Sequence, residues 1–460
     1  MNTVVRRSSL LLPLTFACFV HLPKMAAADD LYDLQSKCQS KGVYSVAAKI
    51  QVDGKLQPSA DAKTASLPIT VRGRFKYDEI RLDDGKTANR RSLRYYHEAG
   101  AAIEVNKHRD SPKLREDSRF VLVHADAAKV SISSLHGPLT REELDLIDLP
   151  ANTLLMDQLM SAEKVNVGGS WKVPDALLAK LVCVDIVSRN EVTCELSNVN
   201  KSVAEIKVGG RLNAAVTGVA TEIRLNGTAT FDLDHHCLTS IQLRIKERRA
   251  IGYVGPGLDV TAQLDIQITP QADSAELTPA IVKEAGESDP STHPLALRSE
   301  TGGYQLVYDR RWHVTRNETQ LVVLRLIDRG ELIAQCNISP LPRLDQGKTV
   351  TIEEFQAEVQ KSLGKRFDKF ETVAEGKGAG GLRVLKVVAS GFASEVPIQW
   401  RYYLAIDPDG RRLALAYTME SDLIERFADA DVAMTESIEF EATSPIPAND
   451  PEKAEAAAKN

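Results

Sequence analysis

Hydrophobic and polar residues alternate with a period of two along much of the chain between residues 29 and 270. The pattern is clearest at 203–208, 220–225 with a continuation at 228–231, 241–246 and 260–268. Turn-forming residues separate these segments, at Gly209-Gly210, Asn226-Gly227, 232–236 and Gly255-Pro256-Gly257. Further strands are expected at 44–52, 69–81, 93–106 and 120–124. Because alternate side chains of a strand point to opposite faces, we predict an antiparallel sheet with one buried face.

Helical signals interrupt this β region near its middle. Thr140-x-x-Glu143 matches a capping box, in which a hydroxyl and a carboxylate bind free backbone N–H groups where a helix begins. Residues 153–160 are largely apolar, and Pro174 opens a helix predicted at 174–181. A long antiparallel sheet covered by inserted helices resembles, in pattern, the half-barrel of bacterial lipoprotein carriers.

The pattern changes at residues 271–296, which are polar and contain Pro290 and Pro294. We interpret them as a linker between a domain at 29–270 and a second domain at 297–440. The second domain mixes strands with helices. Leu321–Leu326 and Leu332–Ile338 flank a turn at 328–330, and a capping box at Thr351 to Glu354 begins an amphipathic helix. The predicted fold class is α+β: a mainly antiparallel β domain with inserted helices, followed by a smaller α/β sandwich.

Residues 297–440 resemble the PsbP/Mog1-like α/β family. The resemblance is carried by Gly303-Tyr304, Tyr308 and Trp312, by 351–355, by Trp400-Arg401-Tyr402-Tyr403-Leu404 and by 437–440. A proline usually precedes the tryptophan hairpin in that family, whereas Asp309-Arg310-Arg311 stands there in this chain. The resemblance implies a sandwich with helices packed on a sheet and no active site. We expect Trp312 to be a core residue, packed between the opening hairpin and the helix that carries Phe355 and Val359.

The two ends of the chain are expected to lie outside these domains. Residues 1–28 have the three parts of a secretory signal peptide: cations at Arg6 and Arg7, an apolar stretch at 10–20, and small residues at 26–28 before Asp29. A membrane anchor is the alternative, but the apolar stretch has about half the ~20 residues that a membrane-spanning helix needs. No later apolar run has that length, so no transmembrane segment is expected in the mature chain. Residues 441–460 are expected to form a disordered tail.

Composition narrows the possible functions. The 460 residues include 57 Lys and Arg against 63 Asp and Glu, so no basic surplus indicates nucleic-acid binding. The few cysteines do not form a disulfide scaffold. Cys183 and Cys194 flank a turn-like segment, where either a disulfide or two reduced thiols fit the sequence.

Several residues can carry chemistry, and each has a simpler structural explanation. His235-His236-Cys237 follows two aspartates and contains metal-ligand types, but it lies where a turn is needed. Tyr95-Tyr96-His97-Glu98 alternates like an ordinary strand, and 376–381 is a glycine-rich loop without a phosphate-binding signature. Arg244, Lys246 and Arg248 share one strand face, which either receives an anionic partner or lipid headgroup or is simply solvated. No catalytic residue, cofactor or metal is predicted.

These observations favour an exported, non-catalytic binding or cell-envelope assembly protein, periplasmic or extracellular. Its ligand would be a protein, a peptide or a lipid, and not a nucleic acid. The alternative is a hydrolase-like enzyme whose site residues come together only in the fold. A structural role in a surface complex is a third interpretation.

Overall fold

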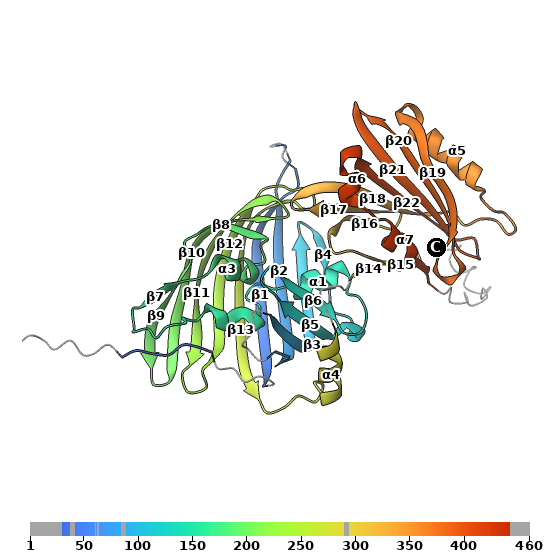
Figure 1. The fold of residues 1–460 in the computed structure, drawn as a ribbon. Coiled ribbons are helices and arrows are strands. Elements are labelled where there is room, and N and C mark those ends of the chain that lie inside the picture. The colour runs from blue at the N-terminus through green and yellow to red at the C-terminus, as the bar shows by residue number, and fades with distance from the viewer. Residues whose placement is uncertain are drawn as a thin grey trace, which may run out of the picture.

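The computed structural model describes residues 30–36, 42–59, 61, 64–83, 89–288 and 294–441. These residues form a 13-stranded, a 7-stranded and a 3-stranded sheet with several short helices, which is the predicted α+β class (Figure 1). The predicted signal peptide lies outside the described residues, as does the predicted tail beyond residue 441. Within the described ranges, no helix has the length and apolar character needed to cross a bilayer.

The first unit is the 13-stranded sheet, in which every paired strand is antiparallel to its neighbour. The order along the sheet is β6-β5-β3-β2-β1-β13-β12-β11-β10-β9-β7, with β4 beside β3 and β8 beside β10. The first and last strands of this unit, β1 and β13, therefore pair at the centre of the sheet. The strands are β1 Val43–Gln57, β2 Leu67–Arg81, β3 Arg90–Val105, β4 His108–Asp110, β5 Phe120–Ala125, β6 Val130–Ser134, β7 Ser170–Lys172, β8 Ile186–Asn190, β9 Thr193–Asn200, β10 Val203–Val216, β11 Val219–Asp232, β12 Cys237–Arg249 and β13 Gly257–Gln271.

The predicted turns at Gly209-Gly210 and Asn226-Gly227 are wrong, because β10 and β11 continue through them. The turn between these strands is Thr217-Gly218. Gly210 and Gly227 instead allow the backbones of neighbouring strands to approach closely. A Cβ at Gly210 would lie 2.2 Å from the carbonyl oxygen of Glu191, and one at Gly227 would lie 2.1 Å from that of Gln242. Glycine inside a strand is typical of such close approaches.

Helices α1 (Arg141–Ile147), α2 (Thr153–Met156) and α3 (Asp175–Leu181) cover one face of this sheet. Their leucines pack in one buried cluster with inward-facing strand residues, including Leu144, Leu154 and Leu178 with Ala48, Phe75 and Ile241. This face is the inner face of the sheet, and the alternation of the strands leaves the opposite, outer face polar.

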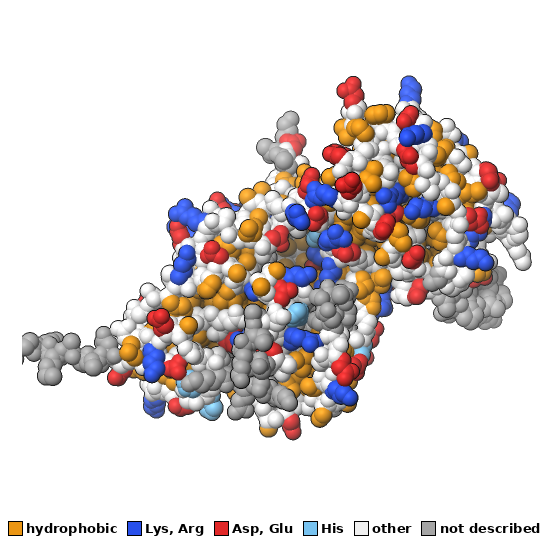
Figure 2. Space-filling view, viewed as in Figure 1, with side chains coloured by type: hydrophobic (Ala, Val, Ile, Leu, Met, Phe, Trp, Pro, Cys, Tyr) orange, Lys and Arg blue, Asp and Glu red, His pale blue; other side chains and the backbone are white. Residues whose placement is uncertain are grey.

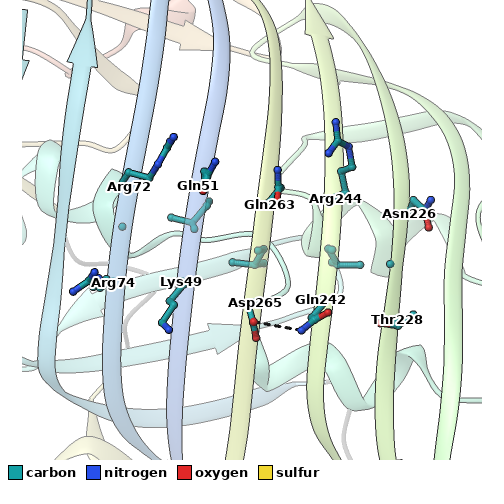
Figure 3. A pocket seen from close by; sticks show the side chains of 15 residues that line it. Lys49, Gln51, Arg72, Arg74, Asn226, Thr228, Gln242, Arg244, Gln263 and Asp265 are labelled. Carbon is teal, nitrogen blue, oxygen red and sulfur yellow. Dashed lines mark hydrogen bonds between the residues drawn. The ribbon is translucent and has the colours of Figure 1, made fainter.

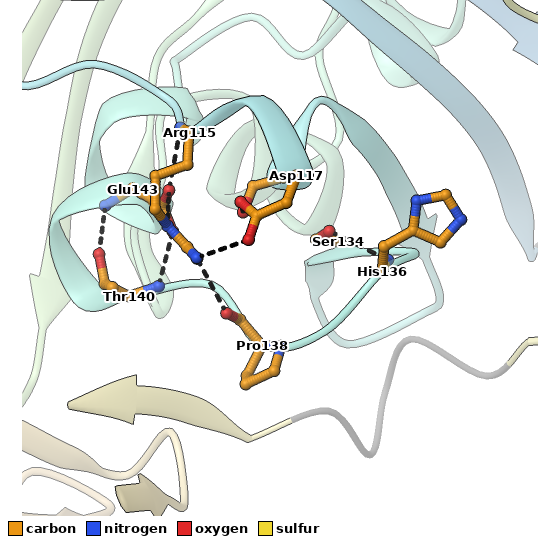
Figure 4. Close-up of polar contacts among 8 residues, drawn as sticks. Arg115, Asp117, Ser134, His136, Pro138, Thr140 and Glu143 are labelled. Carbon is orange, nitrogen blue, oxygen red and sulfur yellow. Dashed lines mark hydrogen bonds and ion pairs between the residues drawn. The ribbon is translucent and has the colours of Figure 1, made fainter. Parts of the chain in front are cut away.

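The predicted capping box begins α1, and it is part of a larger polar cluster (Figure 4). The Glu143 carboxylate accepts hydrogen bonds from the Thr140 backbone N–H at 2.9 Å and from Arg115 Nε at 2.7 Å and Nη2 at 2.8 Å. Burial alone would raise the pKa of Glu143, but the hydrogen bonds from Arg115 and the backbone lower it overall. The cluster holds the start of α1 against the segment that precedes β5.

A second buried network holds α2 against the sheet. Glu79 on β2 accepts hydrogen bonds from Arg94 Nε at 2.8 Å, from Ser92 Oγ at 2.7 Å and from Thr153 Oγ1 at 2.6 Å. Arg94 also donates to Oδ1 of Asn152 at 2.6 Å, and Asn152 caps the start of α2. The charges of Glu79 and Arg94 compensate each other, and the network connects α2 to β2 and β3.

The predicted linker at 271–296 contains helix α4 (Pro279–Glu287), which packs on the first sheet. Its Ala285 and the preceding Leu277 are buried with Ile80, Leu93 and Leu122. The segment is therefore more structured than its polar composition indicates. β14 (Leu295–Ser299) then begins the second unit, and Ala296 donates its backbone N–H to Leu139 of the first unit at 2.8 Å.

The second unit contains the 7-stranded sheet, in the order β16-β17-β18-β22-β21-β20-β19, and the 3-stranded sheet β14-β15-β23. The predicted capping box at Thr351 and Glu354 and the predicted hairpin at 328–330 are both confirmed. The further elements are β15 Tyr304–Tyr308, β16 Trp312–Glu318, β17 Leu321–Asp328, β18 Glu331–Leu341, α5 Ile352–Leu363, β19 Phe367–Lys377, β20 Arg383–Ala393, β21 Val396–Ile406, β22 Arg412–Glu420, α6 Ile424–Phe427, α7 Val432–Glu436 and β23 Glu439–Phe440.

Trp312 is fully buried, as predicted, but its predicted neighbours are wrong. It stacks edge-on against Tyr417 and Phe427, with ring centroids 5.9 and 6.2 Å away. Helix α5 covers a different cluster, in which Phe355 and Val359 pack with Trp400. Trp312 and α5 therefore belong to different cores.

The two units contact each other closely. A single buried cluster includes residues from both, among them Leu144 of α1 and Leu295 of β14. The turns of two hairpins meet at Gly218 and Gly330, where a Cβ on Gly218 would lie 2.6 Å from the Cα of Gly330. The division into domains at 29–270 and 297–440 stays a prediction.

Candidate functional site

The outer face of the large sheet carries polar side chains in straight rows across its central strands. Figure 3 shows two such rows, one from Arg72 to Asn226 and the other from Arg74 to Thr228. The pairing register produces them, because Gln51 lies opposite both Arg72 and Gln263, and Arg244 lies opposite both Gln263 and Asn226. The rows border a hollow of about 700 Å³.

A second hollow, of about 340 Å³, adjoins the first along β11 and β12. It contains the most unusual arrangement on this face. Arg224 on β11 lies opposite Arg211 on β10 and also opposite Lys246 on β12. All three side chains are exposed. Like charges directly opposite each other destabilise a sheet, so packing within this sheet gives no reason for the row.

Basic residues also extend to the opposite side of the first hollow. A third hollow, of about 570 Å³, shares Arg72 and Arg74 with the first and adds Lys113 and Arg119. Together, eleven cations and four carboxylates line the three hollows, although the whole chain has a net charge of −6. The cations are Lys49, Arg72, Arg74, Lys113, Arg119, Arg189, Arg211, Arg224, Arg244, Lys246 and Arg248, and the carboxylates are Glu98, Glu191, Glu222 and Asp265.

We name this surface the basic face. Four of its arginines have carboxylate partners: Arg72 with Asp53 at 3.0 Å, Arg119 with Glu116 at 3.4 Å, Arg189 with Glu191 at 2.5 Å and Arg248 with Asp259 at 3.1 Å. Arg211, Arg224 and Lys246 make no side-chain ion pair or hydrogen bond with any residue that the structure describes. On the helix-bearing face seen in Figure 2, by contrast, acidic and basic side chains are interspersed.

Only part of the basic face could be predicted from the sequence. Arg244, Lys246 and Arg248 lie on it, as their shared strand face indicates. Arg211 and Arg224 were missed, although each alternates with buried residues and so had to face away from the core. What the sequence did not reveal was which cations lie opposite each other, because that depends on register.

The other residues singled out from the sequence occupy separate places. Asp232, at the end of β11, accepts the backbone N–H groups of Asp234 and His235, and its carboxylate lies 2.9 Å from His235 Nδ1. His97 lies 3.0 Å from Asp78, and Tyr95 stacks on Phe120. Cys183 and Cys194 are both free thiols. Cys183 precedes β8 and Cys194 lies on β9, and these strands pair with different stretches of β10 and not with each other. Among the described residues, no group of three or more His, Cys, Asp or Glu side chains is arranged to hold a metal ion.

Titratable groups also gather where α1 meets the second unit. Desolvation, and after it the neighbouring Asp145 carboxylate, raises the pKa of Asp148 to about 6. The Cys183 thiol donates to Asp148 Oδ1 at 3.9 Å. Desolvation and then Arg141 lower the pKa of His313 to about 4. The imidazole is thus neutral at neutral pH. The adjoining hollow holds about 230 Å³, between α1, the β10–β11 turn and β16.

Comparison with known proteins gives no family for this chain. No protein-family model matches it, and no curated protein does. Among solved structures, it is similar to PsbP from the cyanobacterium Synechocystis sp. PCC 6803, with 14% identity over 32% of this chain and 92% of that one and a TM-score of 0.26. A mutant of the protein Mog1 matches with 11% identity over 33% of this chain and 97% of that one, at 0.27. Lipovitellin matches with 7% identity over 52% of this chain and 26% of that one, at 0.32.

Proposed function

We propose that this chain is a non-catalytic binding protein whose basic face receives an anionic polymer or surface. The observation that carries the proposal is the row formed by Arg211, Arg224 and Lys246, whose charges lie opposite each other without a partner. An arrangement that is unfavourable in the free protein is typical of a site whose partner supplies the missing charge.

The extent of the basic face supports a large partner. Its hollows run from β10 across β11, β12, β13, β1 and β2 to β3. With strands about 4.8 Å apart, these seven strands span about 29 Å. A small anion would occupy one hollow, whereas an extended anionic partner would contact all three. A hollow lined mostly by positive charges also raises the rate of encounter with an anionic partner.

The test is retention of the full chain on a heparin matrix, used as a general polyanion and measured by the salt concentration at elution. The triple variant Lys49→Gln, Arg74→Gln, Arg244→Gln removes three cations of the hollow in Figure 3. Each contact that neutralises a fixed anionic charge adds to the salt dependence of binding, so we expect markedly earlier elution.

The matched control is Lys348→Gln, Lys361→Gln, Lys365→Gln, which removes the same charge from exposed positions of the second unit. It should elute close to the parent. Equal loss of retention in both triple variants would show that only net charge matters and would contradict the proposal.

Export and the enzyme alternative are separate questions. That the chain is exported and begins near Asp29 stays a prediction, which N-terminal sequencing of the protein from its host tests. The hydrolase-like alternative would draw on Asp148 and His313 at the junction, where burial perturbs both pKa values. Turnover of a nitrophenyl ester that disappears in Asp148→Asn would favour that alternative.

A further inference from the structure

We propose that Arg211, Arg224 and Lys246 form a binding site for a tetrahedral dianion, a phosphate group in particular. This inference rests on the proposed function, because it names the chemical group that one part of the basic face recognises. The three residues lie on three consecutive strands at the same level of the sheet. They line one hollow of about 340 Å³.

The register brings the three side chains within reach of one anion. Residues directly opposite on antiparallel strands have Cβ atoms about 4.5–5.5 Å apart, so the outer two members are about 10 Å apart. An arginine or lysine side chain is long enough to bridge half of that separation. Arg224 lies in the middle, so an anion above it meets a guanidinium on one side and an ammonium on the other. Guanidinium groups bind phosphate through paired N–H donors, and the ammonium adds a compact charge.

The charge of the row favours a dianion over a carboxylate. A phosphate monoester carries about −1.5 to −2 at neutral pH and offers three acceptor oxygens. One such group can offset two of the three positive charges and bind donors from all three side chains. A carboxylate has a single charge and two oxygens, so it would leave one cation of the row without a contact.

Neighbouring charges leave the row open to a ligand. Glu191 at the rim already pairs with Arg189 at 2.5 Å. Arg248 pairs with Asp259 at 3.1 Å. Glu222 lies in the adjoining row, opposite Arg248 and Asn213, and not opposite any of the three cations. Glu191 lies beside Arg211, to whose carbonyl oxygen it donates its backbone N–H at 2.8 Å. On β10, β11 and β12 themselves, no carboxylate lies directly opposite the row.

The experiment is titration calorimetry of the full chain with inorganic phosphate at low ionic strength, with acetate as the carboxylate probe. The test variant is Arg224→Gln. The matched control is Lys207→Gln, which removes one exposed cation from the same outer face of β10, where it lies opposite Glu195 and Thr228. Circular dichroism establishes that both variants fold.

We expect phosphate to bind more tightly than acetate. Arg224→Gln should weaken phosphate binding at least tenfold, and Lys207→Gln should change it less than twofold. Equal affinity for acetate and phosphate would overturn the inference, as would equal effects of the two variants.

Vesicles distinguish the source of the group. Binding to phosphatidic acid vesicles but not to phosphatidylcholine vesicles, lost in Arg224→Gln, would assign the phosphate to a lipid headgroup even where free phosphate binds weakly. If neither inorganic phosphate nor phosphatidic acid binds, the inference fails. Heparin retention that persists in that case would leave the proposed function standing, so the two failures can be told apart.

Discussion

Arg224 lies directly opposite Arg211 on β10 and directly opposite Lys246 on β12. Like charges directly opposite each other destabilise a sheet. Elsewhere on the outer face, Lys207 faces Glu195 and Arg244 faces Gln263. Lys49 does face another cation, Arg74, but it has the carboxylate of Asp265 opposite it on its other side. The row therefore offers a test that needs no ligand, because its repulsion must appear in the stability of the free protein.

The first prediction is that Arg224→Thr stabilises the protein. Removing the middle charge relieves repulsion on both sides, and threonine suits a strand, so the free energy of unfolding should rise by about 0.5 kcal/mol. The part of the gain that comes from relieved repulsion should vanish near 1 M salt, where the Debye length is about 3 Å. Urea unfolding at low and high salt measures both. The control Arg248→Thr, which loses its ion pair with Asp259, should not gain stability.

The second prediction is that Trp312→Ala strongly destabilises the full chain. Trp312 is 0% exposed and packs between Tyr417 and Phe427, so its removal leaves a large cavity. Such a truncation costs about 3–5 kcal/mol. The control Phe392→Ala removes an aromatic ring that is 54% exposed and should stay within about 0.5 kcal/mol of the parent. Similar melting temperatures for the two variants would contradict the assigned core.

The third prediction concerns acid stability and Glu143. Its pKa is lowered in the folded protein from an ordinary value of 4.5, so the unfolded chain binds the proton more readily. The contribution of Glu143 to stability is therefore present above about pH 4.5 and is lost as pH falls through the folded pKa. In Glu143→Gln, the free energy of unfolding should fall less steeply with acid than in the parent. An unchanged acid slope would show that the ion pair with Arg115 contributes nothing.

The fourth prediction concerns the junction of the two units. Gly218 and Gly347 share a φ of +79°, so alanine is strained equally at both. Only at Gly218 does a Cβ meet another backbone, that of Gly330, whereas nothing lies within 4 Å at Gly347. Gly347→Ala should cost about 1–2 kcal/mol and leave the shape unchanged. Gly218→Ala should cost more and also change the small-angle scattering profile, because the hairpins must separate.

The alternation of the strands and the two capping boxes predicted much of the fold. Both signals are local: a period of two needs only neighbouring residues, and a capping box spans four. The capping at Thr140 and Thr351 followed from residue type alone. Trp312 was correctly predicted to be buried, but its partners were not. Alternation shows that a residue is buried without showing which of two cores receives it.

The sequence did not predict that Arg211, Arg224 and Lys246 lie opposite each other, because their alignment depends on the register between strands. The two-residue turn at Thr217-Gly218 fixes Arg211 opposite Arg224, whereas the sequence predicts the turn at Gly209-Gly210. On the next strand pair, a bulge between Thr230 and Phe231 shifts the register by one residue. Without the bulge, Arg224 would face Ile245 instead of Lys246. Bulges depend on the whole sheet, so single-strand patterns do not reveal them.

The central pairing of β1 with β13 also constrains how the first unit can fold. Partners in this pair lie 200 to 228 residues apart in the chain, from Gln57 with Gly257 to Val43 with Gln271. The strands on either side form mostly by local hairpins, so each half of the sheet can assemble early, but the halves join only when β13 is available. Contacts between distant residues slow folding, because the entropy of closing the loop is lost first. Until closure, β1 and β13 each present a long unpaired edge. The interval before that joining is therefore when the chain is most prone to pair with other copies of itself.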